Sequence, residues 1–379
     1  ASEVDFFGQL QLDATDVSPA GAPMLSAGDV LRSLKAGVGV EVSDRLGGQV
    51  ELAMPSGGNV SLDDSYLHYR VTENTSLSLG HYKVYHTMSA ATSERDGGLP
   101  ERSMVSDAFE VGTGGQLGAF LHSYGDSWSL QTGVSLDDLN EDTEDTDGWG
   151  LHVRATYAPI LSGTSFLHVG LSVYHRNEKD DMLSLAAQPE AWLDGDDVFT
   201  SSLTPADRYR HANIEVAGSR GPWLIQAEYG GLRTKGTETY TYDGGYVAAS
   251  YVLTGEHRPY DAASGTVAAL VPAQPLGHGA GAWEVSVRYS RLDLQDRGQG
   301  TYGHTWAASL NWYATESLRL MIGATDFSTD GDTHQRGNTF GMRMQMGGDQ
   351  MTASGQEGMF MGCRGNVRFG CIGSKLPFW

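Results

Sequence analysis

The sequence predicts an all-β fold, a transmembrane antiparallel β-barrel of about sixteen strands. Segments of about ten residues alternate apolar and polar side chains, which is the period of a strand with two unlike faces. Short and long connections alternate between these segments. Tryptophan and tyrosine recur near the segment ends, as in the aromatic girdles of membrane barrels. No run approaches the ~20 apolar residues of a membrane helix.

The composition excludes several other classes. The chain has 379 residues, of which 19% are charged and 50 are glycine, and its formal net charge is −22. Its aromatic residues and low charge content argue against disorder, and its many glycines argue against a helical bundle. The acidic balance argues against a nucleic-acid partner, because neutralising phosphates requires a basic face.

The alternation can be followed along the whole chain. In one segment Trp149, Leu151 and Val153 share a face, and His152 and Arg154 lie on the other. The predicted strands are Val4–Asp13, Val30–Val42, Leu46–Met54, Val60–Val71, Leu77–Lys83, Gly115–Ser123, Ser127–Asp137, Trp149–Ala158, Leu167–Tyr174, His211–Val216, Trp223–Tyr229, Val247–Leu253, Trp283–Ser290, Thr305–Trp312, Leu318–Gly323 and Thr339–Met346.

The connections separate a membrane barrel from a soluble β-protein. Short turns such as Ser43–Arg45 are interleaved with the long loops Ala14–Gly28, Val84–Gly114, Asn177–Asp207 and Gly255–Gly281. We therefore expect short turns on one side of the barrel and long loops on the other. The alternative is a soluble β-solenoid or a secreted multi-sandwich protein, but strands in such proteins are usually nearer ~5–6 residues.

Several motifs follow one another in a fixed order along the chain. VSLDDSYLHYRV spans residues 60–71, LGHYK spans 79–83, and ERS at 101–103 closes a long loop. Later come GGYVAASYVLTGEHRPYD at 244–261 and WEVSVRYSRLDL at 283–294. In this order the motifs resemble the phosphate- and polyphosphate-selective porins of the Porin O/P family, and the resemblance covers about Val4–Met346. It implies a sixteen-stranded trimeric barrel in the bacterial outer membrane, whose third loop folds inward and narrows the pore.

The same resemblance implies where the constriction lies. The inward loop is Val84–Gly114, and the predicted constriction residues are Lys83, His86, Arg95 and Arg102. Lys83 and Arg102 match family positions by motif. We interpret His86 as a pore-lining polar group rather than a metal ligand.

Basic residues on the predicted lumen face suggest how solutes are selected. The predicted pore-lining residues are Lys35, Arg154, Arg288, Arg319 and Arg343. The same face holds Glu51, Glu215, Glu228 and Glu284, and the lysine cluster of phosphate-specific family members is not visible. We therefore expect passive diffusion of small hydrophilic solutes with a weak preference for phosphate-like anions. The alternative is a non-conducting structural outer-membrane protein tethered by its tail.

The two ends of the chain differ in character. The start at Ala1 suits a chain from which a signal peptide has been cleaved. We divide the rest into a barrel, residues 1–346, and a Gly/Met-rich extension, residues 347–379, interpreted as a mobile tail rather than a plug or docking segment. Cys363 and Cys371 lie in this extension, either as isolated thiols or as a local disulfide.

Catalytic and cofactor motifs are not evident, so no enzyme activity, cofactor or metal is predicted. Acidic stretches at Asp137–Asp147 and Glu178–Asp197 are either solvated loops or sites where divalent cations bridge to anionic lipid. The expected partners are outer-membrane lipid and lipopolysaccharide, small anions, and two further copies in a homotrimer.

Overall fold

The wall strands separate an apolar face from a polar one, as the alternation predicts. On β10 (Trp149–Ser162), Leu151 and Val153 point outward and are 43% and 45% exposed. Their neighbours His152 and Arg154 point inward and are 4% and 0% exposed. An apolar outer face and a polar lumen are the arrangement that a barrel in lipid requires.

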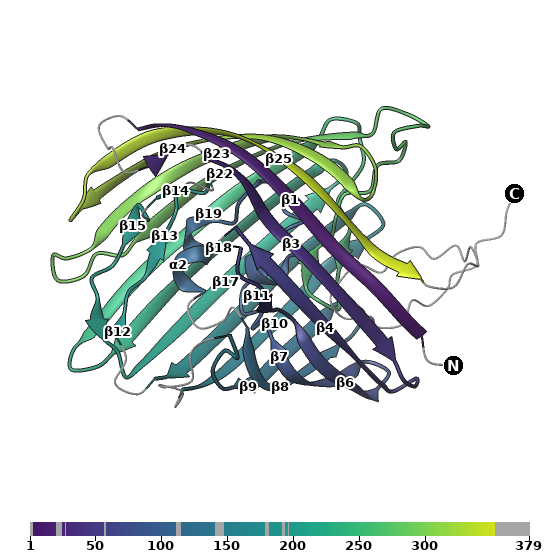
Figure 1. Cartoon of the computed structure of the whole chain (residues 1–379), viewed down its shortest axis with the longest axis horizontal. Helices are drawn as coiled ribbons and strands as arrows, with labels where there is room; N and C mark the ends of the chain where they lie inside the picture. Colours follow the sequence, from purple (N-terminus) through teal and green to yellow (C-terminus); the bar gives the residue numbers. More distant parts are fainter. Residues whose placement is uncertain are drawn as a thin grey trace, which may run out of the picture.

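The computed structural model describes residues 3–19, 25–26, 28–56, 58–110, 115–140, 148–178, 182–191, 194–195 and 197–352. A closed barrel of sixteen long strands forms its wall, with the two-residue strand β5 (Ser61–Leu62) added beside β4 (Figure 1). The long strands are β1 (Glu3–Pro19), β3 (Gly28–Glu41), β4 (Leu46–Pro55), β6 (Ser65–Thr72), β7 (Thr75–Tyr82), β8 (Gln116–Tyr124), β9 (Trp128–Ser135), β10, β11 (Ser165–Asn177), β17 (Arg208–Arg220), β18 (Trp223–Lys235), β19 (Thr239–Val252), β22 (Ala282–Asp293), β23 (Thr301–Tyr313), β24 (Leu318–Gly331) and β25 (Gln335–Thr352).

The first and last strands close the barrel. Leu10 of β1 faces Leu34 of β3 on one side and Met346 of β25 on the other, and both pairings are antiparallel. β25 continues past the predicted end of the barrel as far as Thr352, which pairs with Asp5. Residues 353–379, including Cys363 and Cys371, lie outside the described residues.

The two mouths of the barrel differ in their connections, though not as simply as the sequence suggests. We call the mouth with connections 42–45, 73–74, 125–127, 163–164, 221–222, 253–281 and 314–317 the turn mouth, and the opposite one the loop mouth. The long connection 253–281 thus lies at the turn mouth, which corrects the expectation that all long connections share one side. It packs into the lumen, so its length does not mark an outside loop.

Apolar side chains fill the part of the lumen near the loop mouth. The segment 83–110 carries the short helices α1 (Met88–Ala91) and α2 (Met104–Phe109), and α2 lies within the outline of the barrel (Figure 1). Val105 and Phe109 of α2 pack with Phe199 of the 178–207 connection and with Tyr209 of the wall. Within the described residues, neither helix is long and apolar enough to cross a membrane.

Candidate pore constriction

The segment 83–110, here called the third-loop segment, is folded into the lumen by local caps and by apolar burial. The Thr87 hydroxyl accepts a hydrogen bond from the backbone N–H of Ala90 at 2.9 Å, and the Ser103 hydroxyl accepts one from Val105 at 3.2 Å. Each cap satisfies a donor that a helix start leaves unpaired. Met88 and Met104 are 0% exposed, so both helices bury their apolar sides.

Three of the arginines predicted to line the pore instead hold this segment against the wall. Arg288 donates to the carbonyls of Glu101 and Arg102 at 3.0 and 2.9 Å. Arg319 donates to the carbonyls of Arg95 and Gly97 at 2.9 and 2.6 Å. Arg343 donates to the carbonyl of Pro100. These arginines lie on the predicted lumen face but are buried beneath the loop.

Buried carboxylates neutralise two of these arginines, Arg343 and Arg288. Both oxygens of Asp13 on β1 accept from Arg343, at 2.7 and 2.6 Å, and Glu101 of the third-loop segment also pairs with it. Arg288 pairs with Glu190 at 2.7 Å. Buried ion pairs of this kind fix a geometry, because removing one partner leaves an uncompensated charge. Their contribution to the field that a passing solute experiences is correspondingly small.

A second segment enters the lumen from the turn mouth. In residues 253–281, here called the second inward segment, the carbonyls of Ser264 and Gly265 accept from Arg154, both at 2.7 Å. Arg258 forms two 2.7 Å hydrogen bonds to Glu284 of β22 and reaches the carbonyl of Asp96 at 2.6 Å. Asp96 belongs to the third-loop segment, so Arg258 joins the two inward segments.

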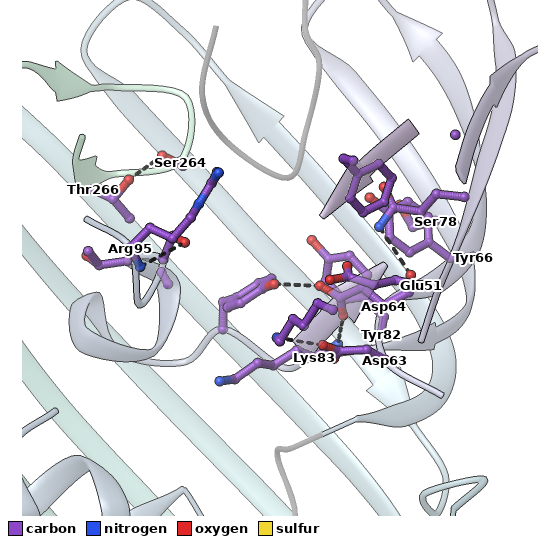
Figure 2. Close-up of a pocket in the computed structure, with 18 of the residues that line it drawn as sticks. Glu51, Asp63, Asp64, Tyr66, Ser78, Tyr82, Lys83, Arg95, Ser264 and Thr266 are labelled. Carbon is purple, nitrogen blue, oxygen red and sulfur yellow. Dashed lines mark hydrogen bonds and ion pairs between the residues drawn. The ribbon is translucent and has the colours of Figure 1, made fainter. Parts of the chain in front are cut away.

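A cavity of about 270 Å³ remains between these segments and the short strands of the wall. Four of the predicted basic residues line it: Lys35, Lys83, Arg95 and Arg102. Figure 2 shows Lys83 close to Asp63 and Asp64, with Arg95 in a separate group beside Ser264 and Thr266. The carboxylates that line the cavity are Asp5, Glu41, Glu51, Asp63, Asp64, Glu94, Asp96 and Asp261.

The charges around the cavity largely compensate one another. Lys35 Nζ lies 2.6 Å from Asp63, and Glu110 lies 3.9 Å from Lys83 and 3.4 Å from Arg102. The enclosed position of Glu94 acts to raise its pKa, but Arg102, Lys35 and Lys83 outweigh that effect and hold the pKa well below its usual range. Glu94 is therefore ionised among cations, and the constriction has mixed charge.

His86 lies apart from the other predicted constriction residues. Its side chain is 0% exposed, and its ring lies 5.0 Å from that of His211 and 5.7 Å from that of Tyr174. Burial lowers the pKa of His86, so the imidazole is neutral. Among the residues that the structure describes, no group of three His, Cys, Asp or Glu side chains could hold a metal ion.

Sequence analysis missed several residues that shape the constriction. Arg258 falls in a segment that was predicted as an ordinary loop, and Asp13 and Glu190 were not singled out. Arg32 was missed as well, although it pairs with Glu101 at 3.2 Å. Alternation identifies the face on which a wall residue lies, but it carries no signal for which distant loop that residue meets.

Sequence comparison matches most of the chain to one family. Residues 12–347 match the family model described as phosphate-selective porin O and P. Porin O of Pseudomonas aeruginosa is 25% identical over 329 residues, which cover 76% of this chain and 72% of that protein. An uncharacterised protein of Caulobacter vibrioides is 30% identical over 366 residues, covering 89% of this chain and 73% of that one.

Solved structures match the same architecture. A loop L8 deletion mutant of OmpT, an outer membrane protein of Vibrio cholerae, aligns with a TM-score of 0.58 and 16% identity, covering 92% of this chain and 99% of that one. OprB of Pseudomonas putida gives a TM-score of 0.61 at 9% identity, covering 91% and 94%. At these identities the likeness concerns the fold. Together with the sequence matches, it shows that the chain belongs to the phosphate-selective porin O and P family and is a β-barrel porin of the bacterial outer membrane, not an enzyme.

Proposed function

We propose that the chain is a passive channel for small hydrophilic solutes, with a weak preference for anions. The observation that supports this most is the cavity beside the third-loop segment, lined by Lys35, Lys83, Arg95 and Arg102. The four cations attract anions in a narrow passage whose walls have a low dielectric constant, but eight carboxylates line the same cavity. The proposed preference for anions therefore rests on the family description, phosphate-selective porin.

The preference is weak because the cations are compensated. Lys35, Lys83 and Arg102 each lie within 4.0 Å of a carboxylate, and Glu94 adds a further negative charge. Paired charges in a wet passage are largely screened beyond about 8–10 Å at ordinary salt. A tight phosphate site needs several converging donors, and the cavity surrounds its cations with carboxylates instead.

We further propose that the channel is a homotrimer. The short strands β4, β6, β7, β8 and β9 present apolar side chains outward, for example Leu67 at 62% exposed and Val134 at 52% exposed. A trimer form of OmpT of Vibrio cholerae shares the fold, with a TM-score of 0.57. Trimers that survive mild detergent and separate on heating would support this assembly, and a monomer under all conditions would contradict it.

Single-channel recording in planar bilayers, with chloride current titrated by phosphate, tests the proposed function. We expect discrete conducting steps and shallow inhibition that develops only at high phosphate. Strong block at low phosphate would show a real phosphate site and overturn weak selectivity.

A non-conducting structural protein is the second candidate, and one observation favours it. The lumen is filled by the third-loop segment, by parts of the 178–207 connection and by the second inward segment, which leaves a cavity of about 270 Å³ in the described part of the chain. Absence of any conducting step in the same recordings, from protein shown to be folded, would select this candidate.

A further inference from the structure

Four cations gather on the outer wall at the loop mouth, away from the lumen. Arg208 and Arg210 lie at the end of β17, and Arg233 and Lys235 lie at the end of β18. All four fall on the outward positions of their strands, in phase with the exposed residues Ile214 and Tyr229. We call these four residues the rim cluster.

The strand register places like charges directly opposite each other in the rim cluster. Arg210 faces Arg233, and Arg208 faces Lys235. Directly opposed residues of an antiparallel pair have their Cα atoms about 4.5–5.5 Å apart, and like charges at such positions destabilise the sheet. An arrangement with this cost is consistent with an anion that binds between the cations.

Carboxylates in the described part of the chain do not supply that anion. Within the described residues, none lies within salt-bridge distance of the rim cluster. The carboxylates on neighbouring strands already have partners: Asp243 accepts from Tyr229 at 2.9 Å and lies 4.0 Å from Arg291, Asp293 lies 3.3 Å from Arg291, and Glu238 pairs with Arg297. Arg210 also donates a hydrogen bond to His175 of β11 at 3.4 Å. The polar part of the outer wall therefore extends to the next strand.

The rim cluster lies at the height of lipid headgroups. Trp223 and Tyr251, whose rings are 4.5 Å apart, mark the aromatic girdle near the turn mouth. From Trp223 to Arg233 the strand rises roughly 33 Å, or about 25 Å along the membrane normal at the usual tilt, which is the height of the apolar band. Because short turns face the periplasm, this end lies at the outer leaflet.

An apolar hollow lies closer to the turn mouth than the cluster and extends from β17 and β18 onto the next two strands, β19 and β22. Its volume is about 380 Å³, and its outward-facing lining includes Ile214, Val216, Tyr229, Val247 and Tyr289. Gly245 leaves room at its floor, since a Cβ there would lie 2.8 Å from the Tyr229 ring. The volume falls in the range of about 300–1,000 Å³ that ligand sites occupy.

From these observations we propose that the rim cluster and the hollow form a binding site for a phosphorylated lipid of the outer leaflet. The phosphate lies between the four cations, where arginine can make bidentate, charge-assisted hydrogen bonds, and an acyl chain lies in the hollow. The site rests on the location in the outer membrane and does not depend on conduction, so it can fail or hold independently of the proposed channel.

The test compares purified full-length protein with diphosphorylated lipid A and with the same lipid after its phosphates are removed. Binding is followed by native mass spectrometry or by the rise in unfolding temperature. The variant Arg210→Gln/Arg233→Gln/Lys235→Gln removes three rim charges. Arg220→Gln is the matched control, because Arg220 is an exposed arginine at the turn-mouth end of β17. Removing opposed like charges does not harm folding, so the variant remains testable.

We expect wild type and Arg220→Gln to prefer the phosphorylated lipid, and the triple variant to bind it on the order of 100-fold more weakly. Chelating divalent cations should not release the lipid, because the arginines contact phosphate directly. Equal binding of both lipids, or full binding by the triple variant, would overturn the proposal. Two further results would also overturn it. Competition by free pyrophosphate at the same concentration as the lipid would indicate a site for soluble phosphate. Dissociation of the trimer when the protein is placed in neutral lipid would indicate that the rim cluster belongs to a subunit interface.

Discussion

The two inward segments reach the lumen from opposite mouths and are held there by different forces. The third-loop segment buries Val84, Met104 and Phe109 in an apolar core, and three wall arginines hold its middle. The second inward segment has fewer apolar contacts. It depends on Arg154, on Arg258, and on Tyr260, whose ring stacks 4.7 Å from Phe166. The comparison indicates that the first segment is the firmer element and the second depends more on its polar contacts.

The largest effect is expected where the firmer segment loses a buried charge pair. Arg343→Met leaves Asp13 buried without its cation and leaves Glu101 with Arg32 alone, which costs about 3–5 kcal/mol of unfolding free energy. Arg343 also donates a hydrogen bond to the carbonyl of Pro100, so the variant loses a contact that holds the third-loop segment. We therefore expect the variant to show a larger and noisier single-channel conductance than wild type. Arg336→Met, an exposed change on the same strand, is the control and should behave as wild type. Unchanged conductance and stability in Arg343→Met would mean that Arg343 does not hold the loop.

A smaller change tests the second inward segment. Arg258→Lys keeps the charge but loses the planar fork that contacts Glu284, Tyr313 and the carbonyl of Asp96. We expect a loss of about 1.5–3 kcal/mol, measured by urea unfolding in vesicles, and cleavage of residues 253–281 by a protease added at the turn mouth. Arg291→Lys changes an exposed arginine, so it should neither lower the unfolding free energy nor expose residues 253–281 to the protease. Equal protease resistance in both variants would show that the segment does not depend on Arg258.

Lys83→Glu tests the contribution of the cavity charges without dismantling either segment. Replacing a cation by an anion beside Glu110 should lower the anion preference, seen as a shift of the reversal potential toward that of a cation channel. Lys235→Glu makes the same charge change on the outer rim and should leave the reversal potential unchanged. A shift of equal size in both variants would mean that overall protein charge, and not the constriction, sets selectivity.

The smallest effect concerns Glu94 and pH. Its pKa in the folded chain lies below the ordinary 4.5, so the stabilisation that the ionised form contributes is present above that value and is lost as pH falls through the folded pKa. The unfolding free energies of wild type and Glu94→Gln should therefore differ by a constant amount from neutral pH down to mild acid, and should converge in strong acid. If the two unfolding free energies already converged near neutral pH, that result would contradict an ionised Glu94 with a lowered pKa.

Much of the wall could be predicted from sequence, because a barrel imposes its two-residue period on every strand. His152 and Arg154 face inward and Leu151 and Val153 face outward, as predicted. The inward position of the third loop came from resemblance to a family. Alternation could not have predicted this inward position, because the third loop shows no alternation of apolar and polar residues.

Sequence could not predict how the constriction is assembled. The wall arginines lie on the predicted face, yet the loops that cover them come from more than a hundred residues away in the chain, as with Arg288 and Glu101. The side of the 253–281 connection was mispredicted because length alone does not distinguish an outside loop from one packed in the lumen. His86 was expected at the pore, but neighbouring aromatic rings bury it.

The reversal potential of the wild-type channel in a planar bilayer, recorded across a KCl gradient, tests the central claim most directly. A passage narrowed by the third-loop segment, whose four lining cations are compensated by carboxylates, predicts a modest reversal potential of the sign set by chloride. A potential of the sign set by potassium would contradict the anion preference, and folded protein that gives no current at all would contradict the channel itself.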